Sequence, residues 1–186
     1  MLRDTTFTDV SRDCVLDEAP TFVMDEDTFR AFYDRTAGGV WSYLARVTGD
    51  RQLADDLLQE TFYRFLRASA AYESENHRRN SLFRIATNLA RDARRRSLIR
   101  GPFSVGGDAI EHVPAADATR ATERQADLTR AMERLKPRER AMLWLAYAEG
   151  ASHVEIADVL GVRPNSLRPM LFRARRRLAA LLGKKP

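Results

Sequence analysis

Residues 151–178 read ASHVEIADVLGVRPNSLRPMLFRARRRL, and this stretch decides the fold of the second half of the chain. Ser152 followed by Glu155 predicts a capping box that starts a short helix, and Gly161 suits the left-handed residue that ends it. Pro164 fits the first turn of a second helix, where its missing N–H costs nothing. A short helix, a glycine turn and an arginine-rich helix are typical of a helix-turn-helix that binds DNA. The alternative is an ordinary helical hairpin with a solvated basic face.

The residues before this pair predict two further helices. Apolar residues at helical spacing indicate a short helix, and Lys136-Pro137 ends it because proline cannot continue a helix. Pro137 then begins the next helix, which Gly150 ends. We therefore expect a four-helix second domain over residues 121–186. The apolar residues that pattern these two helices are Leu128, Met132, Leu135, Met142, Leu143, Leu145, Ala146 and Tyr147.

The stretch between the two halves of the chain has a different composition. Residues 100–119 read RGPFSVGGDAIEHVPAADAT, with two prolines, three glycines and scattered small residues. This composition is typical of a linker. We therefore expect a linker over residues 100–120, preceded by a first domain over residues 25–99 and a tail over residues 1–24.

Three helices are expected in the first domain, where short connections allow them to enclose a small core. Asp25 is a suitable N-cap for the first helix, and Gly38-Gly39 indicates either a bend or a close contact with another helix. The expected helices span about residues 25–47, 51–70 and 79–98, with a polar loop at 71–80. The expected core residues are Phe29, Phe32, Tyr33, Val40, Leu44, Val47, Leu53, Leu57, Leu58, Phe62, Phe65, Leu66, Leu82, Ile85, Ala86, Leu89 and Ala93.

The composition favours an all-α protein of two small helical domains joined by a flexible linker. Of the 186 residues 44% are hydrophobic, and the net charge of +5 makes an anionic partner plausible. The single cysteine, Cys14, excludes an internal disulfide and a cysteine-cluster zinc site. The sequence has no signal peptide and no apolar run of about 18 residues. We therefore expect a cytoplasmic protein that does not insert into a membrane.

One face of the second helix is rich in carboxylates. Asp56, Gln59, Glu60 and Tyr63 lie together by the three-and-four spacing of a helix. An enzyme with Mg²⁺ at Asp55, Asp56 and Glu60 is an alternative interpretation. Because no second acidic cluster and no phosphate-binding glycine loop accompanies these residues, we expect no metal, no cofactor and no catalytic residue.

Arginines dominate the polar side of the third helix and the loop before it. Tyr72 and His77 can stack on exposed bases, and Arg78 and Arg79 can hold phosphates, although a plain surface loop is the simpler interpretation of that stretch alone. In the helix itself the polar side is formed by Arg84, Asn88, Arg91, Arg94, Arg95 and Arg96. So many arginines within a few turns repel one another unless an anion is near, which predicts phosphate contacts and strong salt dependence.

These segments together resemble the extracytoplasmic-function (ECF, group 4) sigma factors of bacterial RNA polymerase. LADDLLQETFYRFL at 53–66 is similar to conserved region 2.2 of that family, and LFRIATNLARDARRR at 82–96 is similar to regions 2.3 and 2.4. LKPRERAMLWLAYAEGASHVEIADVLGV at 135–162 and LFRARRRL at 171–178 are similar to region 4. The resemblance covers about residues 25–98 and 121–180, in the family's order.

The resemblance implies a function and its partners. The chain is expected to bind core polymerase at the β′ clamp coiled coil and the β flap, to open the −10 element and to read the −35 element of promoter DNA. An anti-sigma factor is an expected further partner. The implied polymerase-binding residues are Asp56, Gln59, Glu60 and Tyr63. The implied −10 residues are Tyr72, His77, Arg78, Arg79, Asn80, Arg84, Asn88, Arg91 and Arg95. The implied −35 residues are Asn165, Ser166 and Arg168 at bases and Arg173, Arg175 and Arg176 at phosphates.

The sequence departs from the family pattern at two places. Pro169 and Met170 stand where a small polar and a basic residue are usual, and Ser81 stands where tryptophan is frequent. Proline removes a helix hydrogen bond, at a cost that falls if the helix begins near Ser166. Two alternatives to a sigma factor therefore stay open. One is a sigma-like regulator, such as an anti-sigma-binding protein, without initiation activity. The other is a plain DNA-binding regulator with no affinity for polymerase.

Overall fold

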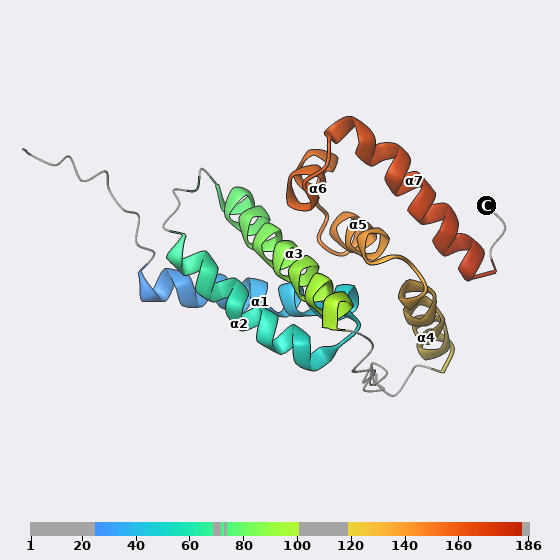
Figure 1. Ribbon diagram of the computed structural model, residues 1–186, viewed down its shortest axis with the longest axis horizontal. Helices are drawn as coiled ribbons and strands as arrows, with labels where there is room; N and C mark the ends of the chain where they lie inside the picture. The colour runs from blue at the N-terminus through green and yellow to red at the C-terminus, as the bar shows by residue number, and fades with distance from the viewer. Residues whose placement is uncertain (1–24, 69–71, 73, 101–118, 184–186) are drawn as a thin grey trace, which may run out of the picture.

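The computed structural model describes residues 25–68, 72, 74–100 and 119–183, and within them the chain is all helical, as predicted (Figure 1). The first domain contains α1 (Glu26–Thr48), α2 (Arg51–Arg67) and α3 (Glu75–Arg100). The second domain contains α4 (Thr119–Glu133), α5 (Pro137–Tyr147), α6 (His153–Leu160) and α7 (Pro164–Leu181). The predicted tail at 1–24, Cys14 within it, and residues 101–118 of the predicted linker lie outside the described residues. No helix of the described part is long and apolar enough to cross a membrane.

The helix ends follow the local signals in the sequence. The Asp25 carboxylate accepts a hydrogen bond from the Thr28 backbone N–H at 2.8 Å and starts α1. In α6 the Ser152 hydroxyl accepts from the Glu155 backbone N–H at 3.3 Å, and the Glu155 carboxylate accepts from the Ser152 N–H at 2.7 Å. Gly161 ends α6 with φ of 62°, a left-handed conformation that glycine adopts without strain. These caps confirm the predicted start and end of the first helix of the helix-turn-helix.

The core of the first domain is built from large side chains of all three helices. The Phe32 and Phe65 rings stack with their centroids 5.2 Å apart, and the Tyr43 ring meets Phe83 edge-on at 5.4 Å. The Tyr43 hydroxyl, which is fully buried, shares a hydrogen bond of 2.7 Å with the Thr87 hydroxyl. Burial raises the pKa of Tyr43 to about 12, because the phenolate has no access to water.

The core of the second domain fixes α7 against the shorter helices. The apolar side chains that recur at helical spacing along α7 are buried, with Leu167 and Ala174 at 0% and Leu171 at 4% exposure. This stripe packs on α5 and α6, so the opposite side of α7 faces outward (Figure 1). The other buried apolar residues of this domain are Ala131, Met132, Leu135, Ala141, Met142, Leu143, Leu145, Ile156, Ala157, Val159 and Leu160.

Four predictions about individual segments or residues are wrong, and one of them is Tyr33, which was predicted as core and is 39% exposed. Residues 75–80, predicted as loop, form the first turns of α3, because the Ser74 hydroxyl accepts from the His77 N–H at 3.1 Å and starts the helix. Tyr147, counted in the apolar pattern of its helix, is 63% exposed at the end of α5. Leu66, predicted as core, is 47% exposed, because it lies on the outer side of α2.

The two domains pack directly on each other. Helix α6 lies against α3 and α5 lies against α1, although 50 or more residues separate these helices in the chain (Figure 1). This contact decides which residues of α3 remain open to a ligand.

Candidate nucleic-acid and protein interfaces

The outer face of α2 gathers the four residues implied to bind polymerase. Asp56, Gln59 and Tyr63 are exposed, Tyr63 to 55%, and Glu60 is half-exposed. The Glu60 carboxylate accepts from Arg64 Nε at 2.6 Å, and the Tyr63 hydroxyl accepts from Arg67 at 3.1 Å. Both bonds link residues one turn apart on α2, so they hold these side chains in place without covering them. The face therefore presents carboxylates beside an aromatic ring.

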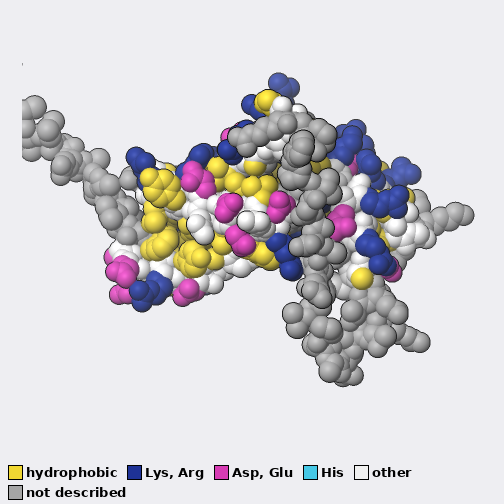
Figure 2. Space-filling view, turned by 60° about the horizontal axis from the view of Figure 1, so that its bottom comes forward, with side chains coloured by type: hydrophobic (Ala, Val, Ile, Leu, Met, Phe, Trp, Pro, Cys, Tyr) yellow, Lys and Arg dark blue, Asp and Glu magenta, His cyan; other side chains and the backbone are white. Residues whose placement is uncertain are grey.

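Two apolar side chains extend this face. Leu66 follows Tyr63 by three positions, so it lies on the same side of α2, and Tyr33 of α1 is 39% exposed with its ring 4.7 Å from that of Phe62. Figure 2 shows hydrophobic and acidic side chains mixed over the left end of the molecule, with a few Lys and Arg among them, and a denser group of Lys and Arg at the right. An apolar patch rimmed by carboxylates is typical of a protein-binding surface.

The magnesium alternative is not supported by the geometry of its proposed ligands. The Asp55 carboxylate accepts from the Trp41 indole N–H at 2.6 Å and is thereby held against α1. Across the part of the chain that the structure describes, no three His, Cys, Asp or Glu side chains are grouped to hold a metal ion.

The polar face of α3 carries most of the implied −10 residues. Asn80, Arg84, Asn88, Arg91 and Arg95 recur at intervals of three or four, so they share one side of the helix. Asn88 and Arg95 are exposed. The second domain, in contrast, contacts Arg79, Asn80, Arg84 and Arg91.

The start of α3 forms an aromatic cluster with the end of α2. The Tyr72 ring lies parallel to Phe65 at 5.3 Å and meets His77 edge-on at 5.7 Å. The Arg78 guanidinium lies 5.9 Å from the Tyr72 centroid and 5.8 Å from that of Phe32. Burial raises the pKa of the half-buried Tyr72. One face of this ring is already used by Phe65, so a base can stack only on the remaining surface.

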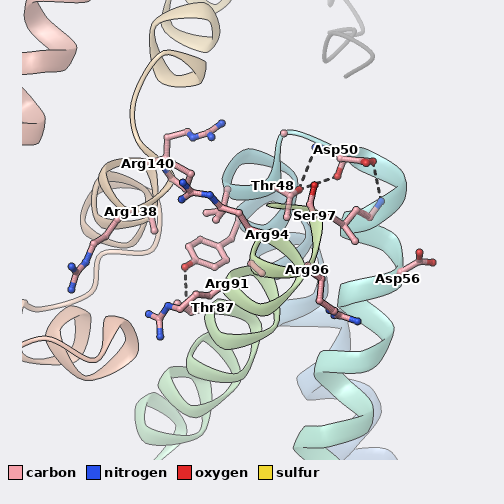
Figure 3. Close-up of a pocket in the computed structure, with 18 of the residues that line it drawn as sticks. Thr48, Asp50, Asp56, Thr87, Arg91, Arg94, Arg96, Ser97, Arg138 and Arg140 are labelled. Atoms are coloured by element: carbon pink, nitrogen blue, oxygen red, sulfur yellow. Dashed lines mark hydrogen bonds between the residues drawn. The ribbon is translucent and has the colours of Figure 1, made fainter. Parts of the chain in front are cut away.

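A crevice of about 1160 Å³ lies where the end of α3 faces α5 (Figure 3). Arg94 of α3 and Arg140 of α5 reach into it from the two domains, and Arg96 points away from them. Burial, and then the charge of Arg94, lower the pKa of Arg140, although Glu133 opposes the shift. The Nε atom of Arg140 is buried, and no group among the residues that the structure describes accepts a hydrogen bond from it. The crevice is therefore an electropositive surface suited to anions.

The outward side of α7 presents all six residues implied to contact the −35 element. Asn165, Ser166 and Arg168 are exposed near its N-terminus, and the three arginines implied to hold phosphates are exposed farther along. Arg175 donates to the Tyr147 hydroxyl at 3.3 Å, and the Arg176 guanidinium lies 5.9 Å from the Phe172 ring centroid. Helix N-terminal residues on an exposed basic face are those that a helix-turn-helix uses to read DNA.

Pro169 lies in the second turn of α7, because that helix begins at Pro164. The arrangement in which proline would fall in the first turn, with a start near Ser166, is therefore not the one observed. Proline has no N–H, so the Asn165 carbonyl loses its usual partner one turn later. Met170, at the other unusual position, is half-buried against the core, whereas Pro169 is exposed on the side implied to face DNA.

Phe172 is an exposed residue of α7 that the sequence reasoning missed. It is 53% exposed and lies four residues after Arg168, on the side of Asn165 and Arg176. An aromatic side chain there can contact a thymine methyl group. The exposure of Phe172 could have been predicted from the sequence, since Phe172 falls outside the apolar stripe of Leu167, Leu171 and Ala174 at 100° per residue.

Comparison with known proteins identifies two conserved regions. Residues 32–98 match the family described as Sigma-70 region 2, and residues 125–178 match the family described as Sigma-70, region 4. The RNA polymerase sigma factor CarQ of Myxococcus xanthus is 31% identical, with 86% of this chain and 91% of that protein covered. The ECF RNA polymerase sigma factor SigL of Mycobacterium tuberculosis is 30% identical, with 82% of this chain and 88% of that protein covered. Both matches extend across the two helical domains.

A solved structure shares the fold. The sigma factor RpoE in complex with the anti-sigma factor NepR from Bartonella quintana aligns with a TM-score of 0.69, at 21% identity. The alignment covers 85% of this chain and 98% of that one.

Proposed function

Because the chain belongs to the ECF sigma factors of the sigma-70 family, we propose that it binds core polymerase through α2 and promoter DNA through α3 and α7. The family consists of transcription initiation factors rather than enzymes. The chain accordingly directs RNA polymerase to promoters and supports initiation. The observation that carries the assignment of surfaces is that the exposed face of α2 combines carboxylates with apolar side chains, whereas the polar face of α3 and the outward side of α7 carry exposed arginines.

The proposed polymerase surface is the outer face of α2. Asp56, Gln59, Glu60 and Tyr63 would contact the β′ clamp coiled coil, with Leu66 added from its exposure. Exposed apolar residues give such a contact its area, while the carboxylates select a basic partner and speed association. The β flap would contact the second domain.

The proposed DNA surfaces are the polar face of α3 for the −10 element and the outward side of α7 for the −35 element. At the −10 element, exposed bases would stack near Tyr72 and His77, and Arg78, Arg79, Arg84, Arg91 and Arg95 would hold the strand with Asn80 and Asn88. At the −35 element, Asn165, Ser166 and Arg168 would contact base edges while Arg173, Arg175 and Arg176 hold phosphates. Phe172 joins the base-contacting group.

The remaining assignments follow from the family. We place the functional regions at residues 25–99 and 121–186, with a tail at 1–24 and a linker at 100–120. The protein acts in the cytoplasm, catalyses no reaction itself and needs no cofactor or metal. An anti-sigma factor is a further proposed partner of this chain, since RpoE, which shares its fold, was solved with one.

A pull-down with core polymerase tests the α2 surface. Asp56→Arg and Glu60→Arg each place a positive charge where a basic partner is proposed, so each should weaken binding by at least about tenfold. Glu26→Arg on α1 is the matched control, because the Glu26 carboxylate is exposed to solvent and pairs with Arg30 on its own helix. Equal binding by all three variants and the unchanged chain would reject this surface.

A sigma-like regulator without initiation activity is the second candidate, and Pro169 in α7 favours it. Run-off transcription with core polymerase on candidate promoters separates the two functions. A specific product supports the sigma factor. A folded protein that binds polymerase and gives no product on any promoter recovered with the assembled holoenzyme supports the regulator.

A further inference from the structure

The second domain covers part of the proposed −10 surface with oxygen atoms of its own. We propose that the α5–α6 surface carrying Glu149, Glu155 and Asp158, here called the acidic clasp, is an intramolecular competitor of −10 DNA. The clasp occupies the α3 donors in the free protein and must release them before the strand binds. This inference rests on the proposed function of α3.

Glu149 makes the most buried contact of the acidic clasp. Its carboxylate pairs with Arg79 of α3 and accepts a hydrogen bond from the Trp144 indole N–H at 3.1 Å. Arg79 also donates to the Glu149 backbone carbonyl at 3.0 Å. The Glu149 side chain is only 11% exposed. A carboxylate that is buried at a domain contact needs charged partners, and Arg79 supplies the charge.

Three further contacts continue along α3. Asn80 donates to the Glu155 carboxylate at 2.9 Å, and Arg84 lies 3.5 Å from the Asp158 carboxylate. Arg91 donates to the Leu160 carbonyl at 3.2 Å. The hydrogen bond from Asn80 is the largest cause that lowers the pKa of Glu155, followed by bonds from Ser152. The four α3 residues thus meet four groups that all present oxygen acceptors, as DNA phosphates and base edges do.

The backbone of α1 is shaped to receive the clasp. A Cβ atom at Gly39 would lie 3.2 Å from Glu149 Oε1, so the absence of a side chain makes room for the carboxylate. Close by, the Arg46 guanidinium lies over the Trp144 ring at 4.9 Å, and burial lowers the pKa of Arg46. Complementarity at both the charged and the aromatic positions indicates a specific contact between the domains.

The clasp carboxylates and the DNA phosphates compete because both need the same N–H donors of α3. A guanidinium that donates its N–H groups to a carboxylate cannot at the same time donate the same N–H groups to a phosphate. Asn88 and Arg95 stay exposed and can make the first contact with DNA. Full engagement of the strand then requires the second domain to move off α3. The Arg84–Asp158 ion pair is half-exposed on both sides, and such pairs are weak and reversible, so binding energy from polymerase and DNA can separate the domains.

The test is a pair of charge-neutralising double variants. Glu149→Gln with Asp158→Asn removes two clasp charges and leaves every α3 residue unchanged. The matched control, Glu26→Gln with Asp127→Asn, removes one Glu and one Asp that pair with Arg30 and Arg130 within their own helices. Both variants alter the net charge equally, and thermal unfolding checks that each is folded.

Two measurements use these variants. Fluorescence anisotropy measures binding of a labelled, AT-rich single-stranded oligonucleotide at fixed salt. Acrylamide quenching measures the exposure of Trp144 in a Trp41→Phe background, because the chain has two tryptophans and the Trp144 indole donates to Glu149 of the clasp, whereas the Trp41 indole donates to Asp55. The clasp variant should bind the oligonucleotide about 3- to 10-fold more tightly than the unchanged chain, and its Trp144 should be quenched more strongly.

The outcomes separate the clasp from the proposed function. Equal DNA affinity and equal quenching in the clasp variant and the unchanged chain overturn the clasp, as does an equal gain by the control. If no protein binds the oligonucleotide, the −10 role of α3 fails and the competition fails with it. In that case a rise in Trp144 quenching would still show that the domains separate, and would identify the function as the part that is wrong.

Discussion

Gly38 and Gly39 offer a matched pair of substitutions that measures the domain contact in solution. Both glycines lie in the interior of α1, where alanine is favoured over glycine by about 0.8–1.0 kcal/mol. Within the part of the chain that the structure describes, a Cβ at Gly38 meets no atom within 4 Å, whereas a Cβ at Gly39 lies 3.2 Å from Glu149 Oε1. Gly38→Ala should therefore stabilise the protein by about 0.8 kcal/mol, through helix propensity alone.

Gly39→Ala gains the same helix propensity, but it also disturbs the contact with Glu149, which lowers stability. The new methyl group must displace the Glu149 carboxylate by a few tenths of an ångström, yet Arg79 and Trp144 hold that carboxylate. A hydrogen bond to a charged group contributes about 1.5–3 kcal/mol, and the 36% exposure of Arg79 reduces that value. We expect the loss of about 1 kcal/mol to cancel the gain, so that Gly39→Ala leaves the free energy of unfolding near that of the unchanged chain.

Urea-induced unfolding of the two variants, followed by circular dichroism, measures the difference between them. A midpoint that rises for Gly38→Ala only, with the same m-value, supports a domain contact through Glu149. An equal rise for both variants would show that no carboxylate lies beside Gly39 in solution. The contact between α1 and α5 would then be absent from the free protein.

Three further predictions concern single residues. Pro169→Ala should restore a helix hydrogen bond and raise the free energy of unfolding by about 1–3 kcal/mol, measured by urea titration; no change would mean that α7 already compensates for the proline. The pKa of Glu155 is lowered in the folded state, so its contribution to stability is present above pH 4.5 and is lost as pH falls through the lower folded value. Glu155→Gln should reduce the loss of unfolding free energy between pH 4.5 and lower pH, and an unchanged loss would show that Glu155 does not cause it. The pKa of Tyr43 is raised to about 12, so its contribution is complete below pH 10 and is lost as pH rises toward 12. Absorbance at 295 nm should show one tyrosine titrating late, and Tyr43→Phe should remove that step.

The local parts of the fold could be predicted from the sequence because their causes are local. The capping box at Ser152, the turn at Gly161 and the first-turn proline at Pro164 each depend on residues within one helical turn, and the structure confirms each of them. The apolar stripe of α3 was predicted for the same reason. The start of α3 was wrong because Ser74, rather than any apolar residue, begins that helix.

The contacts between the domains could not be predicted, because the two partners of each contact are far apart in the sequence and no local pattern links them. Arg79 and Glu149 are separated by 70 positions, and Asn80 and Glu155 by 75. Gly39 was interpreted as a bend or a close contact, and only the folded chain shows that a close contact with Glu149 explains it. Leu66 fitted the spacing of a core residue as well as that of an exposed face, so its exposure depended on what packs beside α2.

A protein that binds DNA with many arginines has an electrostatic problem when the DNA is absent. Here the guanidinium groups of α3 repel one another along the helix, and Arg94 also raises the cost of charge on Arg140 across the crevice. Carboxylates at the facing surface of the second domain relieve part of this repulsion in the folded protein. The same carboxylates compete with phosphate for the same donors, so relief of repulsion and inhibition of DNA binding have one cause. A stronger clasp would stabilise the free protein and slow the separation of the domains that DNA binding requires. Because Arg79, Arg84 and Asp158 are partly exposed, their ion pairs are weak enough to open reversibly.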